Sequence, residues 1–216
     1  MDRICHVIGG GEFCPERFAP KDDDFIIAAD AGYELLENIG ITPHITIGDF
    51  DSLGFVPNVQ RIVLPTVKDD TDTGYAVKWA YKEGFRRFEL HGCTGGRVDH
   101  TLANIQTLAM LSRLGCDVRM HSQNTTYYAL TDAMVCFDNS ACGILSVFAH
   151  GGCATVSISG LEYELDHADL DPFFPLGVSN SFVGRHSTIT VHNGTALIVA
   201  PSNTSGNIFV NKRRHQ

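Results

Sequence analysis

The sequence predicts an α/β plus all-β protein, with an N-terminal Rossmann-like α/β domain on a mainly parallel sheet and a C-terminal β-sandwich or flattened barrel. Two observations predict this. Over roughly the first 120 residues, short apolar runs alternate with segments of helical periodicity, which is typical of βα units. From about residue 124 the segments become short, β-branched and partly alternating, which favours antiparallel strands. We therefore expect one domain over residues 1–122 and a second over residues 123–216.

The N-terminal half alternates candidate strands with candidate helices. The strands are expected at "ICHVIG", "FIIAAD", "HITIGD", "RIVLP", "RFELHG" and "DVRMH". Helices are expected at residues 33–40, 72–84 and 99–115, where apolar residues recur at helical spacing. Each helix runs into a glycine (Gly40, Gly84 or Gly115), the residue that most easily adopts the left-handed conformation of a helix C-cap.

The C-terminal half contains candidate strands in four segments, at residues 125–139, 143–150, 154–170 and 186–200. The turn-forming stretches "DNSACG", "HGG" and "HNG" separate them. There is no internal repeat and no low-complexity linker, so the domain boundary is predicted from the change of pattern alone.

The composition excludes several functional classes. A formal charge of −9 argues against nucleic-acid or anionic-membrane partners, because both require clustered Lys and Arg. We interpret the basic run Lys212-Arg213-Arg214 as a solvated chain end. Seven scattered cysteines without a CxxC pair indicate neither a zinc knuckle nor a disulfide framework. Without a signal-like segment or a run of about 18 apolar residues, a cytoplasmic protein with reduced thiols is expected.

Carboxylates follow four successive candidate strands. In chain order they are Asp30, then Asp49 and Asp51 of "GDFDS", then Asp69, Asp70 and Asp72, and finally Asp99. In an open α/β sheet, ligands bind outside the carboxyl ends of the strands, where the loops into helices gather. We therefore expect these carboxylates to share one site.

The residue types at these strand ends predict phosphoryl chemistry. Crowded carboxylates repel one another unless a cation lies among them, and hard oxygen ligands suit Mg²⁺ held together with substrate phosphates. Gly95 and Gly96 allow backbone amides to approach an anion at the start of the helix near Asp99. Arg97 adds a planar guanidinium suited to phosphate oxygens. Together these features favour a Mg²⁺-bound phosphate substrate.

Structural interpretations compete with each of these. Asp72 or Asp99 alone would more often be a helix cap, "GDFDS" a turn, and "KDDTD" a solvated acidic loop. His100 alone would more often be a structural hydrogen-bonding residue. The other nine histidines show no HExxH-like spacing, and we assign them no chemistry.

The stretch "IGGGEF" only partly matches a dinucleotide fingerprint. Gly9 and Gly11 fit G-x-G-x-x-G, and Asp30 lies 21 residues beyond Gly9, but Cys14 stands where the third glycine belongs. A Walker A loop is absent from the sequence. Any bound ATP would have to be held without a P-loop.

The ordered set "AADAGYELL", "ITPHITIGDFDS", "KDDTDTGYAV" and "LHGCTGGRVDHTLANIQTL", followed by "GVSN" in a β-rich half, closely resembles the thiamine pyrophosphokinase family. The resemblance covers nearly the whole chain in order. GDFDS, DxTD and GGRxDH are highly specific in combination, although each alone would be weaker.

The resemblance implies transfer of an intact pyrophosphoryl group from ATP to the thiamine hydroxyl, with Mg²⁺ and release of AMP. It assigns Mg²⁺ and phosphate organisation to Asp49, Asp51 and Asp72, and contacts with metal, phosphates or the hydroxyl to Arg97 and Asp99. The residues implied to form the ATP pocket are Asp30, Gly95, Gly96, Arg97, His100 and Asn104. Asp72 or Asp99 would accept the hydroxyl proton late in the reaction, if an acceptor is needed.

The family also implies a homodimer whose thiamine site lies between the α/β domain of one subunit and the β-rich domain of the other. Ser179 and Asn180 resemble the pair that faces the thiamine pyrimidine. An aromatic stacking residue carried by some relatives on the last strand is not evident in "TALIVA", so Phe173, Phe174 and Phe182 become the candidates. Ala31 replaces the first glycine of the family's "ADGG" segment, which we expect to make the backbone there less permissive.

Two other functions use the same features. A metal-dependent phosphohydrolase would employ the carboxylates to activate water. A nucleotide or dinucleotide sensor would bind without turnover and use the β-rich half to contact a partner. The missing third glycine argues against the sensor, and the carboxylates at four strand ends argue against it more strongly.

Overall fold

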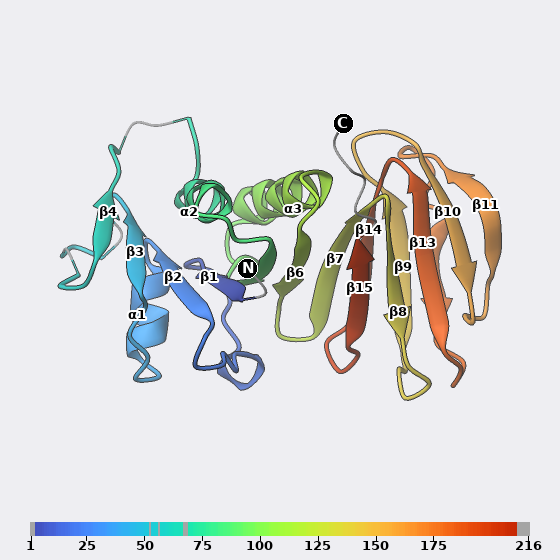
Figure 1. Cartoon of the computed structure of the whole chain (residues 1–216), viewed down its shortest axis with the longest axis horizontal. Coiled ribbons are helices and arrows are strands. Elements are labelled where there is room, and N and C mark those ends of the chain that lie inside the picture. Colours follow the sequence, from blue (N-terminus) through green and yellow to red (C-terminus); the bar gives the residue numbers. More distant parts are fainter. Residues whose placement is uncertain (1–2, 52, 56, 67–68, 211–216) are drawn as a thin grey trace. The chain divides into compact units, whose positions relative to one another are not determined.

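The computed structural model describes residues 3–51, 53–55, 57–66 and 69–210. The chain divides into two compact units, residues 1–107 with 120–123 and residues 108–119 with 124–216, which we call unit 1 and unit 2 (Figure 1). Ser52 of "GDFDS" and the run Lys212-Arg213-Arg214 lie outside the described residues. No helix in the described part of the chain is long and apolar enough to cross a membrane.

Unit 1 contains parallel strands in the order β5-β1-β2-β3-β4, and β6, the other neighbour of β5, is divided between the two units. Strand β1 pairs in parallel with β2 and β5, β2 with β3, and β3 with β4. The strands are β1 (Ile4–Ile8), β2 (Phe25–Ala29), β3 (Ile45–Gly48), β4 (Arg61–Val63), β5 (Arg87–His91) and β6 (Asp117–His121). Strands β1, β2 and β3 are almost completely buried, which explains their continuous apolar runs.

The three predicted helices begin and end close to the predicted positions. They are α1 (Gly32–Glu37), α2 (Asp72–Lys82) and α3 (Val98–Arg113). A short 3-10 helix, η1 (Pro15–Arg17), was not predicted. The glycine caps are confirmed, because Gly40, Gly84 and Gly115 have φ angles of 72°, 97° and 76°. Helix α1 contacts β1 and β2, where its Leu36 packs against Ile8 and Ile26.

Unit 2 is built from antiparallel strands, as the alternating pattern predicts. One set of neighbours has the order β12-β9-β14-β7, and the other is β11-β10-β13-β8-β15. The strands are β7 (Thr125–Thr131), β8 (Ala133–Phe137), β9 (Ile144–Ala149), β10 (Ala154–Ser159), β11 (Leu165–Leu170), β12 (Gly177–Ser181), β13 (Ser187–Asn193), β14 (Thr195–Pro201) and β15 (Gly206–Val210). Residues of both sets, such as Tyr128 and Ile198 from the first and Val156 and Ile189 from the second, share one hydrophobic core.

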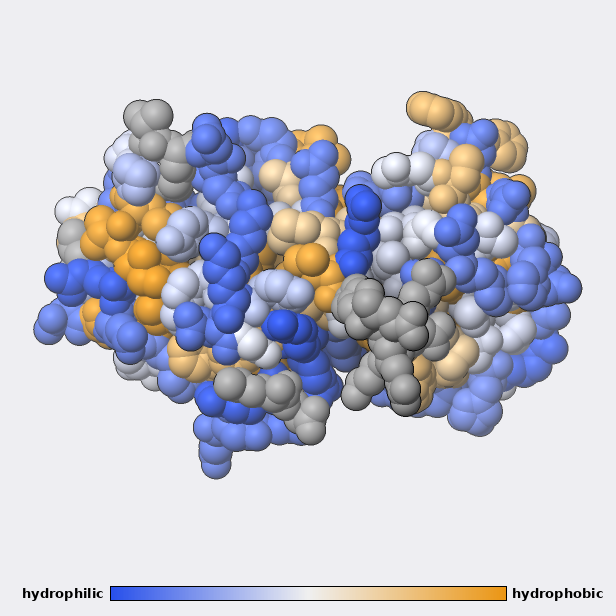
Figure 2. All heavy atoms as spheres, turned by 45° about the horizontal axis from the view of Figure 1, so that its top comes forward, coloured by the Kyte–Doolittle hydropathy of each residue, from blue (hydrophilic) through white to orange (hydrophobic). Residues whose placement is uncertain are grey.

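The expected combination of parallel βα units and β-rich segments is therefore confirmed. Hydrophilic side chains cover much of the face drawn in Figure 2, with smaller hydrophobic areas between them. All seven cysteines lie in the described part of the chain, and none of them forms a disulfide there.

Candidate active site

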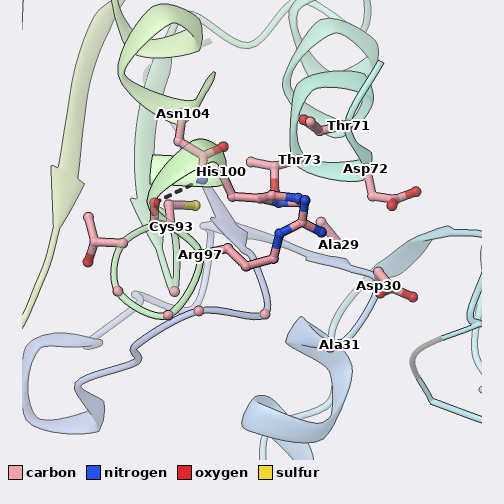
Figure 3. A pocket seen from close by; sticks show the side chains of 16 residues that line it. Ala29, Asp30, Ala31, Thr71, Asp72, Thr73, Cys93, Arg97, His100 and Asn104 are labelled. Carbon is pink, nitrogen blue, oxygen red and sulfur yellow. Dashed lines mark hydrogen bonds between the residues drawn. The ribbon is translucent and has the colours of Figure 1, made fainter. Parts of the chain in front are cut away.

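A cavity of about 390 Å³ lies in unit 1 where loops at the carboxyl ends of the strands meet the first turns of α2 and α3 (Figure 3). Its walls come from the loops that follow β1, β2 and β5. Predicted site residues among those that line it are Asp30, Asp72, Gly95, Gly96, Arg97, His100 and Asn104. Figure 3 shows Arg97, His100 and Asn104 coming from the α3 side, and Asp30 and Asp72 from the β2 and α2 side.

Three of the predicted carboxylates form a tight cluster beside this cavity. Asp30, Asp49 and Asp51 each place one carboxylate oxygen within 4.8 Å of the others. Oδ1 of Asp30 is buried and has no hydrogen-bond partner among the described residues. The backbone N–H of Asp51 donates to Oδ1 of Asp49 at 3.3 Å, which holds the "GDFDS" turn. Close carboxylates with an unused buried acceptor are an arrangement that a divalent cation would stabilise.

The backbone around this acidic cluster adopts an uncommon conformation. Asp30 and Phe50 have φ angles of 47° and 59°, in the left-handed region that costs a residue with a Cβ atom roughly 1 to 2 kcal/mol. Such conformations persist when the surrounding structure fixes them, and they concentrate at functional sites. Phe50 is buried, so its side chain anchors the turn that carries Asp49 and Asp51.

The expectation that Ala31 makes the local backbone less permissive is wrong. Ala31 has a φ of −57°, in the right-handed helical region, and needs no glycine there. The next residue, Gly32, is the one that cannot carry a side chain. A Cβ atom on it would lie 2.0 Å from the backbone oxygen of Ile8.

The glycines after β1 bring two loops together, and Gly10 and Gly11 line the cavity. Strand β1 leads into the 3-10 helix η1 and not into an α-helix. The backbone N–H groups of Gly9 and Gly11 donate to the oxygens of His91 and Gly92, at 2.8 and 2.7 Å. A Cβ atom on Gly11 would lie 2.4 Å from the oxygen of Thr94. Close contact between the β1 and β5 loops therefore explains these glycines.

The loop from β5 to α3 is shaped for close approach of a ligand. Gly95 and Gly96 have φ angles of 76° and 58°, and the space beside Gly96 is open. Nδ2 of the buried Asn104 donates to the backbone oxygen of Cys93 at 2.8 Å, so Asn104 fixes the start of this loop (Figure 3).

Arg97 and Asp99 form a two-point ion pair. Nη2 of Arg97 donates to Oδ2 of Asp99 at 2.6 Å, and Nε donates to Oδ1 at 3.2 Å. These hydrogen bonds raise the pKa of Arg97 and lower the pKa of Asp99. Val98 is the first residue of α3, so Asp99 lies inside the first turn, and its carboxylate contacts Arg97. The structure thus places Asp99 beside Arg97 and not in the acidic cluster of Asp30, Asp49 and Asp51.

The acidic loop before α2 is divided between structural and site residues. The helix cap is Thr71, whose Oγ1 accepts from the N–H of Gly74 at 2.9 Å. Asp70 pairs with Lys78 at 2.6 Å on the surface. Asp72 lies in the first turn of α2 and lines the cavity. Thr71, and not its neighbour Asp72, is therefore the cap of α2.

Some cavity residues were missed by the sequence reasoning. They include Thr73 and Thr94, both buried, and Oγ1 of Thr94 has no hydrogen-bond partner among the described residues. Thr73 follows Asp72 in the sequence, and Thr94 precedes Gly95. Their position next to predicted site residues could have identified both from the sequence. A hydroxyl there is a ready donor to a phosphate oxygen.

The candidate thiamine-binding residues lie in unit 2, in different environments. Asn180 is buried, and its Oδ1 accepts from the N–H groups of Tyr163 and Ser181 while its Nδ2 donates to the oxygen of Tyr163. Most of its hydrogen-bonding capacity therefore stabilises β12 and the loop after β10. Ser179 is exposed with a φ of 62°.

The three candidate aromatic residues differ in how exposed their rings are. Phe182 packs against the core of unit 2, with its ring 5.2 Å from that of Phe137. Phe173 and Phe174 are 93% and 63% exposed between β11 and β12. Of the three candidates, Phe173 and Phe174 therefore have the more accessible rings.

Comparison with known proteins agrees with this arrangement. The model of the thiamin pyrophosphokinase catalytic domain matches residues 19–120, and that of the thiamin pyrophosphokinase vitamin B1 binding domain matches residues 134–198. Thiamine pyrophosphokinase of Bacillus subtilis (strain 168) is 24% identical over 210 residues, covering 91% of this chain and 98% of the relative. Thiamin pyrophosphokinase 1 of Caenorhabditis elegans is 26% identical over 171 residues, covering 72% and 68%.

A solved structure shows the same fold. The crystal structure of the Bacillus subtilis thiamine pyrophosphokinase matches with a TM-score of 0.80 at 21% identity, covering 93% of this chain and 100% of that chain. The two family models together span most of the chain and include both the acidic strand ends and the β-rich half. This chain belongs to the thiamin pyrophosphokinase family.

Proposed function

We propose that this chain transfers the pyrophosphoryl group of ATP to the hydroxyl of thiamine, giving thiamine diphosphate and AMP. One observation carries the proposal: the Asp30–Asp49–Asp51 cluster adjoins a glycine-lined cavity at the carboxyl ends of parallel strands. A triphosphate with its cation fits such a site, because the carboxylates can bind the cation while backbone N–H groups donate hydrogen bonds to the phosphate oxygens.

Asp49, Asp51 and Asp72 would hold Mg²⁺, with the buried Oδ1 of Asp30 beside them. The donor set fits this ion, since carboxylate oxygens are its usual protein ligands. Bound Mg²⁺ would supply charge neutralisation for the phosphates. Within the ATP pocket, Asp30, Gly95, Gly96, Arg97, His100 and Asn104 would contact or support the nucleotide.

The ion pair of Arg97 suggests how the chain responds to ATP. Both side chains are exposed, so little cost opposes exchange of Asp99 for a phosphate oxygen as the partner of the guanidinium. Such exchange would hold the phosphates in line with the thiamine hydroxyl and would release the Asp99 carboxylate. The hydroxyl oxygen then attacks the β-phosphorus, and AMP departs. Asp72 or the released Asp99 accepts the hydroxyl proton late, if an acceptor is needed.

Residues 1–122 would thus form a Rossmann-like catalytic domain, and residues 123–216 a β-sandwich that binds thiamine and forms a homodimer. Phe174 or Phe173 would stack on the vitamin, since both rings are exposed. Ser179 would contact the pyrimidine directly, and Asn180 would position it through β12. The charge of −9 suits small-molecule substrates and a cytoplasmic enzyme without nucleic-acid or membrane partners.

The test is a product assay with ATP, Mg²⁺ and thiamine. Equal amounts of AMP and thiamine diphosphate are expected, and only when thiamine is present. ADP as the nucleotide product would contradict the proposal, because it indicates transfer of a single phosphoryl group. Phosphate or pyrophosphate release without thiamine would identify a phosphohydrolase, and binding without turnover a sensor.

A mixing experiment tests the homodimeric site. Asp49→Asn and Phe174→Ala subunits are each expected to be weakly active alone. If each site takes residues from both subunits, hybrid dimers regain one intact site and part of the activity. Mixtures no more active than their components, under conditions where subunits exchange, would contradict the shared site.

A further inference from the structure

Unit 1 contains a second group of side chains that could hold a metal ion, on the strands themselves and not in the loops that follow them. His6 lies on β1, and Glu89 and His91 lie on β5, which pairs with β1 in parallel. The register places His6 directly opposite Glu89. Glu89 and His91 are two residues apart and therefore face the same side of the sheet. Within the described part of the chain, none of the three lines the cavity.

The three donor atoms are spaced for a single ion. Nδ1 of His6 lies 3.4 Å from Nε2 of His91, and each of these nitrogens lies 3.9 Å from Oε2 of Glu89. Tetrahedral zinc with bonds of about 2.1 Å separates its ligand atoms by roughly 3.4 Å. A closing movement of a few tenths of an ångström would bring all three into coordination distance.

A buried carboxylate orients one of these imidazoles. Nε2 of His6 lies 3.2 Å from Oδ2 of Asp24. The N–H of Lys21 also donates to Oδ2, at 2.9 Å, and the N–H of Ile4 donates to Oδ1, at 3.1 Å. The tautomer of His6 that carries its proton on Nε2 can donate to Asp24, which leaves the lone pair of Nδ1 facing His91 and Glu89. This carboxylate–imidazole arrangement is the usual support of a metal-binding histidine.

The surroundings of the two imidazoles are dry. His6 and His91 are each only 2% exposed, and the ring of Phe18 packs edge-on at 5.4 and 5.2 Å from their ring centres. A cation bound among these side chains would therefore be shielded from water.

His121 on β6 lies beside the group. Its Nδ1 lies 3.1 Å from Nη2 of Arg17, and because a guanidinium only donates, that nitrogen accepts. Nε2 of His121 is buried, lies 3.5 Å from Oε2 of Glu89 and has no hydrogen-bond partner among the described residues.

We propose that Nδ1 of His6, Nε2 of His91 and a carboxylate oxygen of Glu89 bind one divalent cation of the zinc class. Two imidazoles and one carboxylate favour such an ion over Mg²⁺, which prefers oxygen ligands alone. The ion would tie β1 to β5 directly before Gly92 and Cys93, which line the cavity, and so stabilise the loop that forms its floor. This site does not depend on the proposed function of the cavity.

The test measures Zn²⁺ uptake by the chelator-stripped full chain, by equilibrium dialysis and metal analysis without nucleotide. One equivalent is expected to bind to the wild-type chain. His6→Asn, His91→Asn and Glu89→Gln should lose it, and Asp24→Asn should weaken it by about 10- to 100-fold, as for other second-sphere carboxylates. His186→Asn removes an exposed histidine, and Asp49→Asn removes a ligand of the acidic cluster. Both control variants should still bind one equivalent of Zn²⁺.

Failure of the wild-type chain to take up Zn²⁺ would overturn the proposal, as would uptake that depends on Asp49 and not on His91. Circular dichroism shows whether each variant is folded. If the histidine variants do not fold, Co²⁺ added to the wild-type chain decides the question. Intense visible absorption of a four-coordinate, nitrogen-bound ion is expected there, and the weak spectrum of an all-oxygen, six-coordinate ion would contradict the site.

Discussion

The acidic cluster of Asp30, Asp49 and Asp51 and the histidine cluster of His6, Glu89 and His91 belong to the same parallel sheet but differ in almost every property. The first lies in loops at the carboxyl ends of the strands, and its Asp51 is exposed. The second lies within the strands, and its histidines are buried. The acidic cluster offers only oxygens, whereas the histidine cluster offers two nitrogens and one oxygen.

This difference shows how position along a strand determines chemistry. Strand ends open into loops, so a ligand with its hydrated cation can enter and leave, which a substrate site requires. A strand face under packed aromatic rings excludes substrates but can keep a cation permanently. We therefore expect an exchangeable Mg²⁺ at the acidic cluster and a structural zinc-class ion at the histidine cluster.

The largest expected effect is loss of turnover from the acidic cluster. Asp49→Asn and Asp51→Asn should each reduce AMP formation at least about a hundredfold, because loss of metal stabilisation costs several kcal/mol in the transition state. The measurement is the rate of thiamine-dependent AMP formation over a range of Mg²⁺ concentrations. Asp22→Asn, which changes an exposed carboxylate that is not among the predicted site residues, is the matched control. Near wild-type turnover and an unchanged Mg²⁺ requirement in both Asp49 and Asp51 variants would refute the metal assignment.

The second-largest expected effect is stabilisation of the folded chain by Zn²⁺, which should depend on the histidine cluster and not on the acidic cluster. Zn²⁺ at about 100 times its dissociation constant should stabilise the wild-type chain by about 2.7 kcal/mol, since it binds the folded state preferentially. The same stabilisation is expected in Asp49→Asn and none in His91→Asn. Thermal unfolding of the three proteins with and without Zn²⁺ measures it. Equal stabilisation of all three would remove the distinction between the clusters.

A smaller effect concerns the turn that carries Asp30. Gly32→Ala should lower the free energy of unfolding by roughly 1 to 3 kcal/mol or more, because its Cβ atom would overlap the backbone of Ile8. Ala31→Gly should cost less than about 1 kcal/mol, since Ala31 already has helical geometry. Urea denaturation compares the two. A larger loss from Ala31→Gly would mean that the backbone argument is wrong.

The smallest effect is chemical reactivity at Cys93, a buried residue that lines the cavity. Burial raises the pKa of this thiol to about 12, so almost no thiolate exists near pH 8. Alkylation of the folded chain followed by peptide mapping should modify the exposed Cys142 and Cys153 and spare Cys93. Labelling of Cys93 at a similar rate would indicate that the cavity floor opens in solution.

Local pattern was enough to predict the elements that frame the acidic cluster. Apolar runs located β1 to β6, and Gly40, Gly84 and Gly115 marked the helix ends, because these signals are set by residues close in sequence. Strands β12 and β15 were not anticipated, since several of their residues are exposed and their apolar pattern is weak. Pairing with β9 and β8 makes them strands.

The sequence by itself therefore determined the succession of strands and helices and the carboxylates at the strand ends. Only the tertiary structure decided which carboxylates meet, that Asp99 pairs with Arg97, and that Gly9 and Gly11 serve loop contact. It alone revealed the histidine cluster, because His6 and His91 are 85 residues apart in sequence. Their approach depends on the register between β1 and β5, which is set by packing of the whole sheet and by no local motif.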